Sequence, residues 1–308
     1  MIQNVLITGV AGFIGSNLLD HLILRTNWKI TGVDNLTTGS EDNIRHHLTN
    51  HRFKFIKQRC SDIKSLKEFD CIFHLAALPR IQPSFDLIKD HVEANLVQGI
   101  HLIELMVKEK YFPRFVYSGS SAIYGNPKLI PTNENESIKC MNPYAFQKYE
   151  LEKYLELISV RYPSLNYVVL RYFNPYGPRS FNPKNPFNPY SSVVGIFLNK
   201  WKEGKPLLIT GDGSQQRDFI HIADLTEANY SAAVHPEKLN TAFNIGNSST
   251  TSILELAKII SDKYEFIPKR EGEADITFAD ISKAISVLNW KPTYILAEYI
   301  SDFKKKHS

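Results

Sequence analysis

Short apolar runs and segments with helical spacing alternate along the first half of the chain. Runs rich in branched and aromatic residues are typical of buried strands, and they lie at 5–8, 29–33, 53–57, 70–77, 114–118 and 167–172. Helical spacing of apolar residues predicts helices over 17–24, 86–110 and 143–162, and a polar, histidine-rich stretch predicts a short helix at 41–50. Repeated strand–helix units of this kind form a doubly wound parallel α/β sheet with right-handed crossovers.

The pattern changes after Phe173. Residues 174–189 contain five prolines in sixteen positions, which predicts a long loop of functional importance. Beyond it, the spacing predicts helices over 192–202 and 252–263 and strands over 207–210 and 242–246. We expect a smaller mixed α/β C-terminal substrate domain that returns to the main sheet at least once. The expected domains are 1–173 plus 219–246, and 174–218 plus 247–308.

Composition narrows the class of protein. The 308 residues are 43% hydrophobic and 22% charged, as in ordinary globular proteins, and the net charge is only +4. The short Lys304–Lys306 tail is no basic block, so no nucleic-acid partner is expected, and no apolar run is long enough for a membrane span. Cys60, Cys71 and Cys140 show neither metal-ligand spacing nor C-x-x-C. With a strand at the N-terminus and no secretory signal, they predict a cytoplasmic protein without a metal.

Three glycines follow the first strand at a spacing of three residues. Gly9, Gly12 and Gly15 lie between this strand and the first helix, one residue off the usual G-x-G-x-x-G spacing. Without a Cβ, such a turn bends tightly and approaches a pyrophosphate closely, and the free N–H groups of the helix start face the same anion. The context of strand, turn and helix therefore predicts a dinucleotide site.

Asp34 ends the second strand, nineteen positions after Gly15. A carboxylate there accepts hydrogen bonds from the hydroxyls of an adenosine ribose and repels a 2′-phosphate, which favours NAD over NADP. The alternative is that Asp34 only caps the turn at 35–39. The upstream glycines favour the cofactor interpretation.

Tyr144 and Lys148 open the second long helix four residues apart, so both side chains can face one site. A free tyrosine has a pKa of about 10, and lowering it by roughly three units takes about 4 kcal/mol of extra stabilisation of the phenolate. A lysine one turn away and a positive nicotinamide ring can supply that. Small hydroxyl residues at 118–125 follow the fifth strand, where they can hold a substrate oxygen. The alternatives are a solvated Tyr/Lys pair and a serine-rich turn.

Together these motifs resemble the extended short-chain dehydrogenase/reductases, and within them the NAD-dependent epimerase/dehydratase family, in particular the UDP-hexose 4-epimerases. The resemblance runs essentially end to end, and it includes the stretches 171–174, 211–221, 270–273 and 279–284. It implies a Rossmann-type doubly wound sheet with a smaller substrate domain.

The resemblance implies that Ser120 is the catalytic hydroxyl, Tyr144 the acid and base, and Lys148 the residue that tunes Tyr144 and holds the nicotinamide ribose. Asp62 and Ile63 would meet the adenine. The full set implied for NAD is Gly9, Gly12, Phe13, Ile14, Gly15, Asp34, Asn35, Thr38, Gly39, Asp62, Ile63, Leu75, Ala76, Ala77, Asn95, Ser118, Tyr144, Lys148 and Tyr172.

The resemblance also implies a set of residues for a UDP-sugar. Guanidinium forks suit phosphate oxygens, so Arg217 and Arg270 would grip the diphosphate together with Asn174. The family usually has aspartate where this chain has Glu273, and the retained carboxylate is expected to keep its contact with the nucleotide ribose. The full set is Ser120, Ala122, Tyr144, Asn174, Val193, Arg217, Arg270, Glu273 and Thr277.

Several reactions compete on this fold. The 4,6-dehydratases need an acid pair directly after the catalytic hydroxyl, where this chain has Ser121 and Ala122, so dehydration is disfavoured. Decarboxylation or 4-epimerisation of a UDP-uronate stays open. A non-catalytic NAD-binding protein is disfavoured, because Ser120, Tyr144 and Lys148 are all present. UDP-hexose 4-epimerisation through a transient 4-keto sugar requires the fewest groups beyond those already identified.

The resemblance points to Thr277 for substrate size. A bulky aromatic residue at the matching position restricts the pocket to plain hexoses, whereas a small one admits a 2-acetamido group. Thr277 therefore predicts UDP-GlcNAc and UDP-GalNAc as substrates, with UDP-Glc and UDP-Gal alongside; the alternative is that it only packs a strand. Family members also pair the helices at 86–110 and 143–162 across a two-fold axis, which implies a homodimer.

Overall fold

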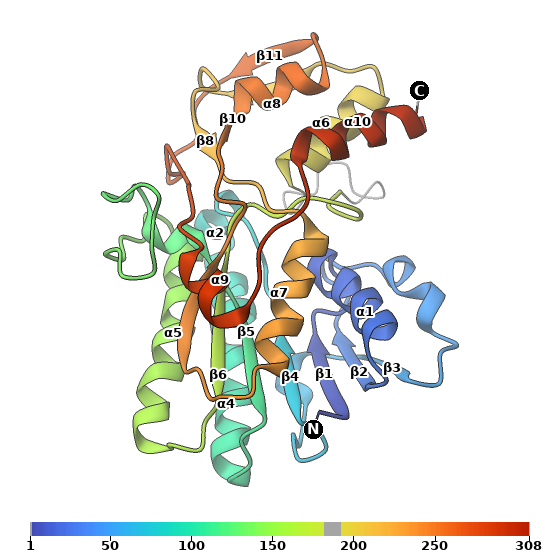
Figure 1. The fold of residues 1–308 in the computed structure, drawn as a ribbon, viewed down its shortest axis with the longest axis vertical. Helices are drawn as coiled ribbons and strands as arrows, with labels where there is room; N and C mark the ends of the chain where they lie inside the picture. Colours follow the sequence, from blue (N-terminus) through green and yellow to red (C-terminus); the bar gives the residue numbers. More distant parts are fainter. Residues whose placement is uncertain (1, 182–191, 308) are drawn as a thin grey trace.

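The computed structural model describes residues 2–181 and 192–307. Seven parallel strands form its main sheet in the order β3-β2-β1-β4-β5-β6-β9, which confirms the doubly wound α/β fold (Figure 1). The chain moves outward from β1 in one direction and then returns to build β4 onward in the other. A crevice therefore opens at the carboxyl ends of β1 and β4. The strands are β1 Asn4–Thr8, β2 Lys29–Asp34, β3 Phe53–Lys57, β4 Cys71–His74, β5 Arg114–Ser120, β6 Tyr167–Tyr172 and β9 Thr241–Ile245.

Helices cover both faces of this sheet. On one face, α1 (Phe13–Arg25), α7 (Ile222–Val234) and α9 (Ser282–Leu288) enclose the first core. On the other face, α4 (Gln98–Glu109) and α5 (Pro143–Arg161) enclose the second core. Alternate residues of a strand point to opposite faces, so neighbouring apolar residues of β1 are divided between the two cores. A near-continuous apolar strand is the expected result.

The segment predicted as one helix over 86–110 is interrupted. It consists of α2 (Gln82–Asp86), α3 (Ile88–Val92), a π-helical turn at Glu93–Val97, and α4. Leu87 leaves the helical region, with φ −106° and ψ 50°, and this separates α2 from α3. The helix predicted over 143–162 is confirmed as α5.

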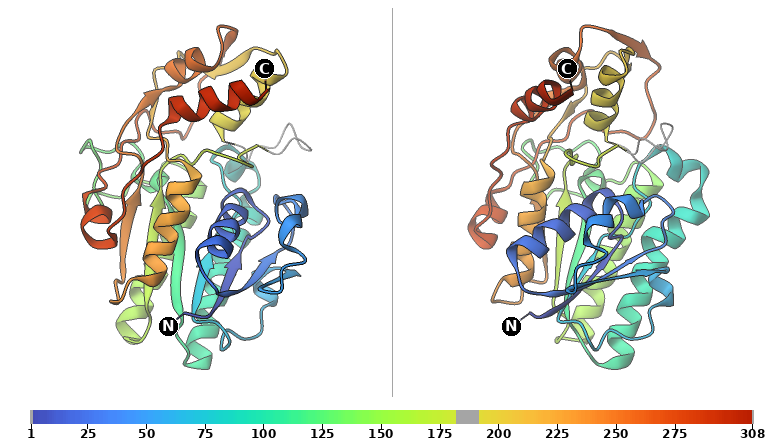
Figure 2. Two further views of the ribbon diagram at one scale, coloured as in Figure 1. Left: turned by 45° about the vertical axis from the view of Figure 1, so that its right-hand side comes forward. Right: turned by 90° about the vertical axis from the view of Figure 1, so that its right-hand side faces the viewer.

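A smaller α/β unit stands above the carboxyl edge of the sheet (Figure 2). Its core joins Phe197, Leu207, Leu256 and Ile300 from different elements. Three helices and two small two-stranded sheets build the unit: α6 Val193–Lys202, α8 Ile253–Ile260, α10 Leu296–His307, β7 Leu207–Thr210 paired with β11 Tyr264–Ile267, and β8 Gln216–Arg217 paired with β10 Thr251–Ser252.

Three predicted elements differ in the structure. The helix predicted over 252–263 ends at Ile260, because Ser261 is extended and β11 follows. The short helix predicted at 41–50 is instead two 3₁₀ turns, Glu41–Asn43 and Arg45–His47. The strand predicted over 70–77 ends at His74. The loop predicted over 174–189 lies only partly within the described residues.

The chain returns to the main sheet, as expected, when β9 pairs with β6. The next part differs from the expected domain boundary, because Ala284, Leu288 and Trp290 pack in the first core. There α9 covers the edge strand β9, and Trp290 Nε1 donates to the carbonyl of Asp224 on α7 at 2.8 Å. Among the described residues, no helix combines the length and the apolar character that crossing a membrane requires.

Candidate active site

A cavity of about 1650 Å³ is lined by residues of the carboxyl edge of the sheet and of the smaller unit. Residues from both parts of the molecule line it, including Asp34 and Tyr144 from one side and Arg217 from the other. Of all the residues expected from the sequence to bind cofactor or substrate, only Gly39, Asp62, Ile63 and Asn95 are outside its lining.

These four residues have structural contacts of their own. A Cβ on Gly39 would lie 2.8 Å from the backbone of Ala11, so this glycine packs against the glycine turn. Asp62 accepts a hydrogen bond from the backbone N–H of Arg59 at 3.2 Å, and Ile63 is buried in the second core. Arg59 itself lines the cavity next to the expected adenine end.

Asn95 lies behind the cavity wall. Its Nδ2 donates to the carbonyl of Leu78 at 3.1 Å, and its Oδ1 accepts from the N–H of the same residue at 2.7 Å. It also donates to Gln147 Oε1 at 3.0 Å, which connects it to α5. Asn95 therefore fixes the loop after β4, whose neighbouring residues line the cavity.

The glycine turn leaves room for a dinucleotide. Gly9 has φ +72°, and a Cβ on it would lie 2.8 Å from the backbone of Ala76. A Cβ on Gly15 would lie 2.1 Å from the Gly9 carbonyl oxygen. The first turn of α1 carries no acidic residue, and no side chain caps it at Gly12. Its free N–H groups and positive helix end therefore suit the pyrophosphate of NAD.

Asp34 is placed rigidly at the end of β2. Only 8% exposed, it accepts from the Ala11 N–H at 2.9 Å and from the Leu36 N–H at 2.7 Å, one with each carboxylate oxygen. Burial raises the pKa of Asp34, and these two hydrogen bonds act in the opposite direction. Each carboxylate oxygen keeps a lone pair for a ribose hydroxyl, since a carboxylate offers about four acceptor sites.

The start of α5 positions Tyr144 and Lys148. Asn142 caps this helix, because its Oδ1 accepts from the Ala145 N–H at 2.8 Å, and Pro143 supplies the pre-set backbone of the first helical position. The Tyr144 N–H, which has no partner within the helix, donates to Ser84 Oγ at 3.2 Å. Both predicted side chains line the cavity one turn apart.

Lys148 is held at the base of the cavity. Its Nζ donates to Ser118 Oγ at 3.3 Å and lies 4.8 Å from the ring centre of Tyr117. Ser118 in turn donates to the carbonyl of His74 at 3.0 Å. Burial lowers the pKa of Lys148 to about 7. The amine therefore changes its charge near neutral pH.

Burial raises the pKa of Tyr144, whereas hydrogen bonding with Ser120 and the positive charge of Arg80 lower it. Arg80 lines the cavity and was not found by sequence reasoning. A charged residue just beyond the carboxyl end of a central strand was the available signal, because side chains at that edge face the crevice.

At the nucleotide end, two side chains from distant parts of the chain are connected. Asn174 donates to Thr277 Oγ1 at 2.9 Å and to the carbonyl of Asp218 at 2.8 Å. Arg217 faces Glu273, with 3.6 Å between Nη2 and Oε2. Burial lowers the pKa of Arg217, and the Glu273 carboxylate opposes this. The two arginines, Arg217 and Arg270, give this end a positive lining.

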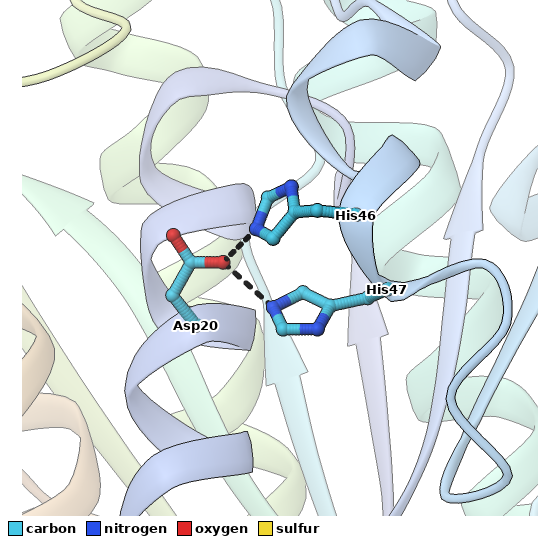
Figure 3. A group of neighbouring side chains, drawn as sticks. All are labelled: Asp20, His46 and His47. Atoms are coloured by element: carbon cyan, nitrogen blue, oxygen red, sulfur yellow. Dashed lines mark hydrogen bonds and ion pairs between the residues drawn. The ribbon is translucent and has the colours of Figure 1, made fainter.

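Asp20 of α1, which is outside the cavity lining, lies beside His46 and His47 (Figure 3). Its Oδ1 accepts from His46 Nε2 and His47 Nε2, each at 2.8 Å, and its other oxygen pairs with Arg179. These three potential ligand atoms lie within 4.8 Å of one another, although no metal site was expected from the sequence. A carboxylate whose charge an arginine already balances attracts a second cation weakly. The cluster joins α1 to the segment after β6.

The fold and cavity define an NAD-dependent enzyme of the short-chain dehydrogenase/reductase type, with tyrosine, lysine and serine in the lining of one cavity. The chain belongs to the NAD dependent epimerase/dehydratase family, which its residues 5–246 match. The family resemblance expected from the motifs is thereby confirmed, and so are the isomerase class and NAD as the cofactor.

Solved structures of three sugar-nucleotide epimerases are similar to this chain over nearly its whole length. The UDP-glucose 4-epimerase of Thermotoga maritima with UDP-glucose is 32% identical, with a TM-score of 0.87 over 99% of this chain and 100% of that one. The UDP-N-acetylglucosamine 4-epimerase of Methanobrevibacter ruminantium, in complex with UDP-N-acetylmuramic acid, is 31% identical, with a TM-score of 0.87 over 98% and 97%. The UDP-glucuronic acid 4-epimerase of Bacillus cereus, with UDP-glucuronic acid and NAD, is 29% identical, with a TM-score of 0.89 over 99% and 100%.

Proposed function

We propose that this protein interconverts UDP-GlcNAc and UDP-GalNAc at C4 of the hexose, and UDP-Glc and UDP-Gal alongside. One observation carries the proposal: a single cavity joins Tyr144, Lys148 and Ser120 at the sheet edge to Arg217 and the other nucleotide-end residues. The first group suits removal and return of hydrogen at a carbinol carbon, and the second suits a nucleotide diphosphate.

Bound NAD would accept hydride from the hexose C4 and return it to the other face of the 4-keto sugar. Tyr144 takes the proton from the C4 hydroxyl and later gives it back, so it serves as base and then as acid. Ser120 hydrogen-bonds with Tyr144 and holds the same hydroxyl in line. Lys148 favours the phenolate and anchors the nicotinamide ribose. Arg217 and Arg270 hold the diphosphate while the sugar turns over.

The substrate preference rests on Thr277. Its side chain lines the cavity, and its hydroxyl accepts from Asn174, so a small and fixed group bounds the sugar pocket. A second candidate substrate is UDP-glucuronate, because the buried guanidinium of Arg80 suits a sugar carboxylate.

Turnover of a panel of UDP-GlcNAc, UDP-Glc and UDP-glucuronate, with NMR identification of each product, tests the substrate preference. Epimerisation of the plain hexose alone would contradict the inference from Thr277, and activity on the uronate alone would favour the second candidate. Tyr144→Phe is expected to lower kcat at least about 10³-fold with NAD still bound. Wild-type turnover by Tyr144→Phe would refute the proposed mechanism.

We also infer a homodimer that pairs α5 and the α3–α4 region of two subunits. Apolar side chains are exposed along α5, among them Phe146 at 52%, Leu157 at 63% and Val160 at 78%. Apolar patches of this kind are typical of subunit interfaces. Light scattering that gives a monomer mass at micromolar concentration would contradict the inference. We infer a cytoplasmic location as well, since Cys60, Cys71 and Cys140 are all free thiols.

A further inference from the structure

We propose that Arg80 is a positioning residue of the active site, whose fixed positive charge favours the phenolate form of Tyr144. This inference rests on the proposed function, because Tyr144 must serve as a base in it. It adds a second cation to the one that the sequence motif supplies, Lys148.

Arg80 is followed by a short segment, 81–84, which hydrogen bonds attach to two other parts of the molecule. Ser84 accepts from the backbone N–H of Tyr144 at 3.2 Å, which attaches the segment to the start of α5. Gln82 donates to the carbonyl of Glu271 at 2.8 Å, which attaches it to the loop that carries Glu273. Arg80 lines the same cavity as Tyr144 and Glu273, and its charge interacts electrostatically with both.

The backbone of Arg80 is held in an uncommon conformation. Its φ is +93°, in the region that residues with a Cβ rarely adopt. Two residues earlier, Asn95 clamps Leu78 through both its N–H and its carbonyl. Such strain persists only where the surroundings over-determine it, and it concentrates at active sites. The fold thus maintains a direction for this side chain that a relaxed backbone would not give.

A second cation is needed to stabilise the Tyr144 phenolate because the charge of Lys148 depends on pH. Among the described residues, Ser120 and Tyr117 from β5 and Arg80 from the loop after β4 interact with Tyr144. Lys148 lines the same cavity one turn further along α5. Burial lowers the pKa of Lys148 to about 7, so its charge is lost as the pH rises above neutrality.

Arg80 keeps its charge over this range. Burial lowers the pKa of Arg80, but a guanidinium stays protonated in proteins at all ordinary pH values. The Arg80 charge lowers the pKa of Tyr144, against the larger opposing effect of burial. Among the described residues, Arg80 is therefore a positive charge that still acts on Tyr144 when Lys148 is neutral.

The test compares Arg80→Gln, which removes the charge, with Arg80→Lys, which keeps it, and with Arg161→Gln as a control at the exposed end of α5. The NAD-bound protein is assayed at saturating UDP-sugar across the pH range. Arg80→Gln is expected to move the acidic limb of kcat upward by about one pH unit, so that kcat at pH 7 falls about 10-fold and recovers in base. Arg80→Lys and Arg161→Gln should retain the wild-type profile.

A readout without turnover separates this inference from the proposed function. The ultraviolet difference spectrum of wild type against Tyr144→Phe reports the tyrosinate directly, and Arg80→Gln should raise its titration midpoint. A uniform loss of kcat at every pH, or a rise in KM alone, would overturn the inference. Loss of activity on UDP-glucuronate alone, with an unchanged pH profile, would overturn it too, because Arg80 would then serve as a carboxylate ligand.

Discussion

The two ends of the cavity are built in different ways. At the cofactor end, the surface consists of backbone and short side chains at strand ends, such as the glycine turn and the buried Asp34. At the nucleotide end, long side chains reach in from short elements and loops, with Arg217 on a two-residue strand and Arg270 exposed on a loop. The sheet fixes one end, whereas the other depends on long side chains carried by short elements and loops.

In the proposed function, NAD stays bound through many turnovers, whereas the UDP-sugar exchanges in each turnover. The two ends of the cavity differ in the way that this requires. A preformed surface loses little conformational entropy when it binds, so NAD can remain through many turnovers. Ordering a long arginine side chain opposes binding by up to about 2 kcal/mol, and this loss favours release of the product. In the proposed function, the ligand that stays bound would therefore lie against backbone, and the ligand that exchanges would lie against side chains.

The largest predicted effect is at the cofactor end. Gly15→Ala places a Cβ 2.1 Å from the Gly9 carbonyl oxygen, so the turn must move away from α1. We expect a loss of about 3 kcal/mol in the free energy of unfolding, together with the bound NAD. Urea denaturation and the NAD content of the purified protein measure both.

The matched control is Gly204→Ala in the smaller unit. Gly204 has φ +68°, but nothing lies within 4 Å of the added Cβ. Only the backbone preference is lost, at about 1–2 kcal/mol, and NAD should be retained. Equal NAD loss in both variants would show that the glycine turn is no more sensitive than an open loop.

An intermediate effect is expected at the nucleotide end. Arg217→Ala removes a charged partner of the diphosphate and should raise KM for the UDP-sugar about 10- to 100-fold, since hydrogen bonds to charged groups contribute about 1.5–3 kcal/mol. The NAD content and the free energy of unfolding should change little. Lys269→Ala, which removes an exposed cation on a neighbouring loop, is the control. Loss of NAD from Arg217→Ala would contradict the independence of the two ends.

The same division explains what could be predicted from the sequence. The glycine turn, Asp34 and the pair Tyr144/Lys148 are local patterns, because their geometry follows from a strand end, a tight turn or one turn of helix. Their place at one cavity then followed from the parallel sheet, whose carboxyl ends meet at one edge. The sequence therefore predicted that these residues meet at one cavity, as the structure shows.

The remaining features depend on contacts between distant residues. Asn174 and Thr277 are 103 positions apart, and no local sequence pattern predicts their hydrogen bond. The family resemblance implied a cofactor contact for Asn95, whereas in the structure its amide holds Leu78. Arg80 belongs to no sequence motif. Its proposed role depends on its strained backbone and on the contacts that the following segment makes with α5 and with the loop of Glu273.

The smallest predicted effect is at the junction of the two ends. Asp20 of α1 pairs with Arg179, which also donates to the Asn43 carbonyl at 3.0 Å and so attaches the segment after β6 to the cofactor end. The pair is partly exposed, with 30% and 20% of the side chains accessible, so solvent screens it. Asp20→Asn should lower the free energy of unfolding by about 0.5–1 kcal/mol, less so at high salt.

Urea denaturation at two salt concentrations measures this loss, and Asp302→Asn, which disrupts an exposed pair on α10, should show almost none. The KM for the UDP-sugar should change less than it does in Arg217→Ala, because Asp20 is outside the cavity lining and is connected to it through Arg179. A large rise in KM without loss of stability would show that the two ends are coupled. The cofactor end would then also determine where the long side chains of the nucleotide end lie.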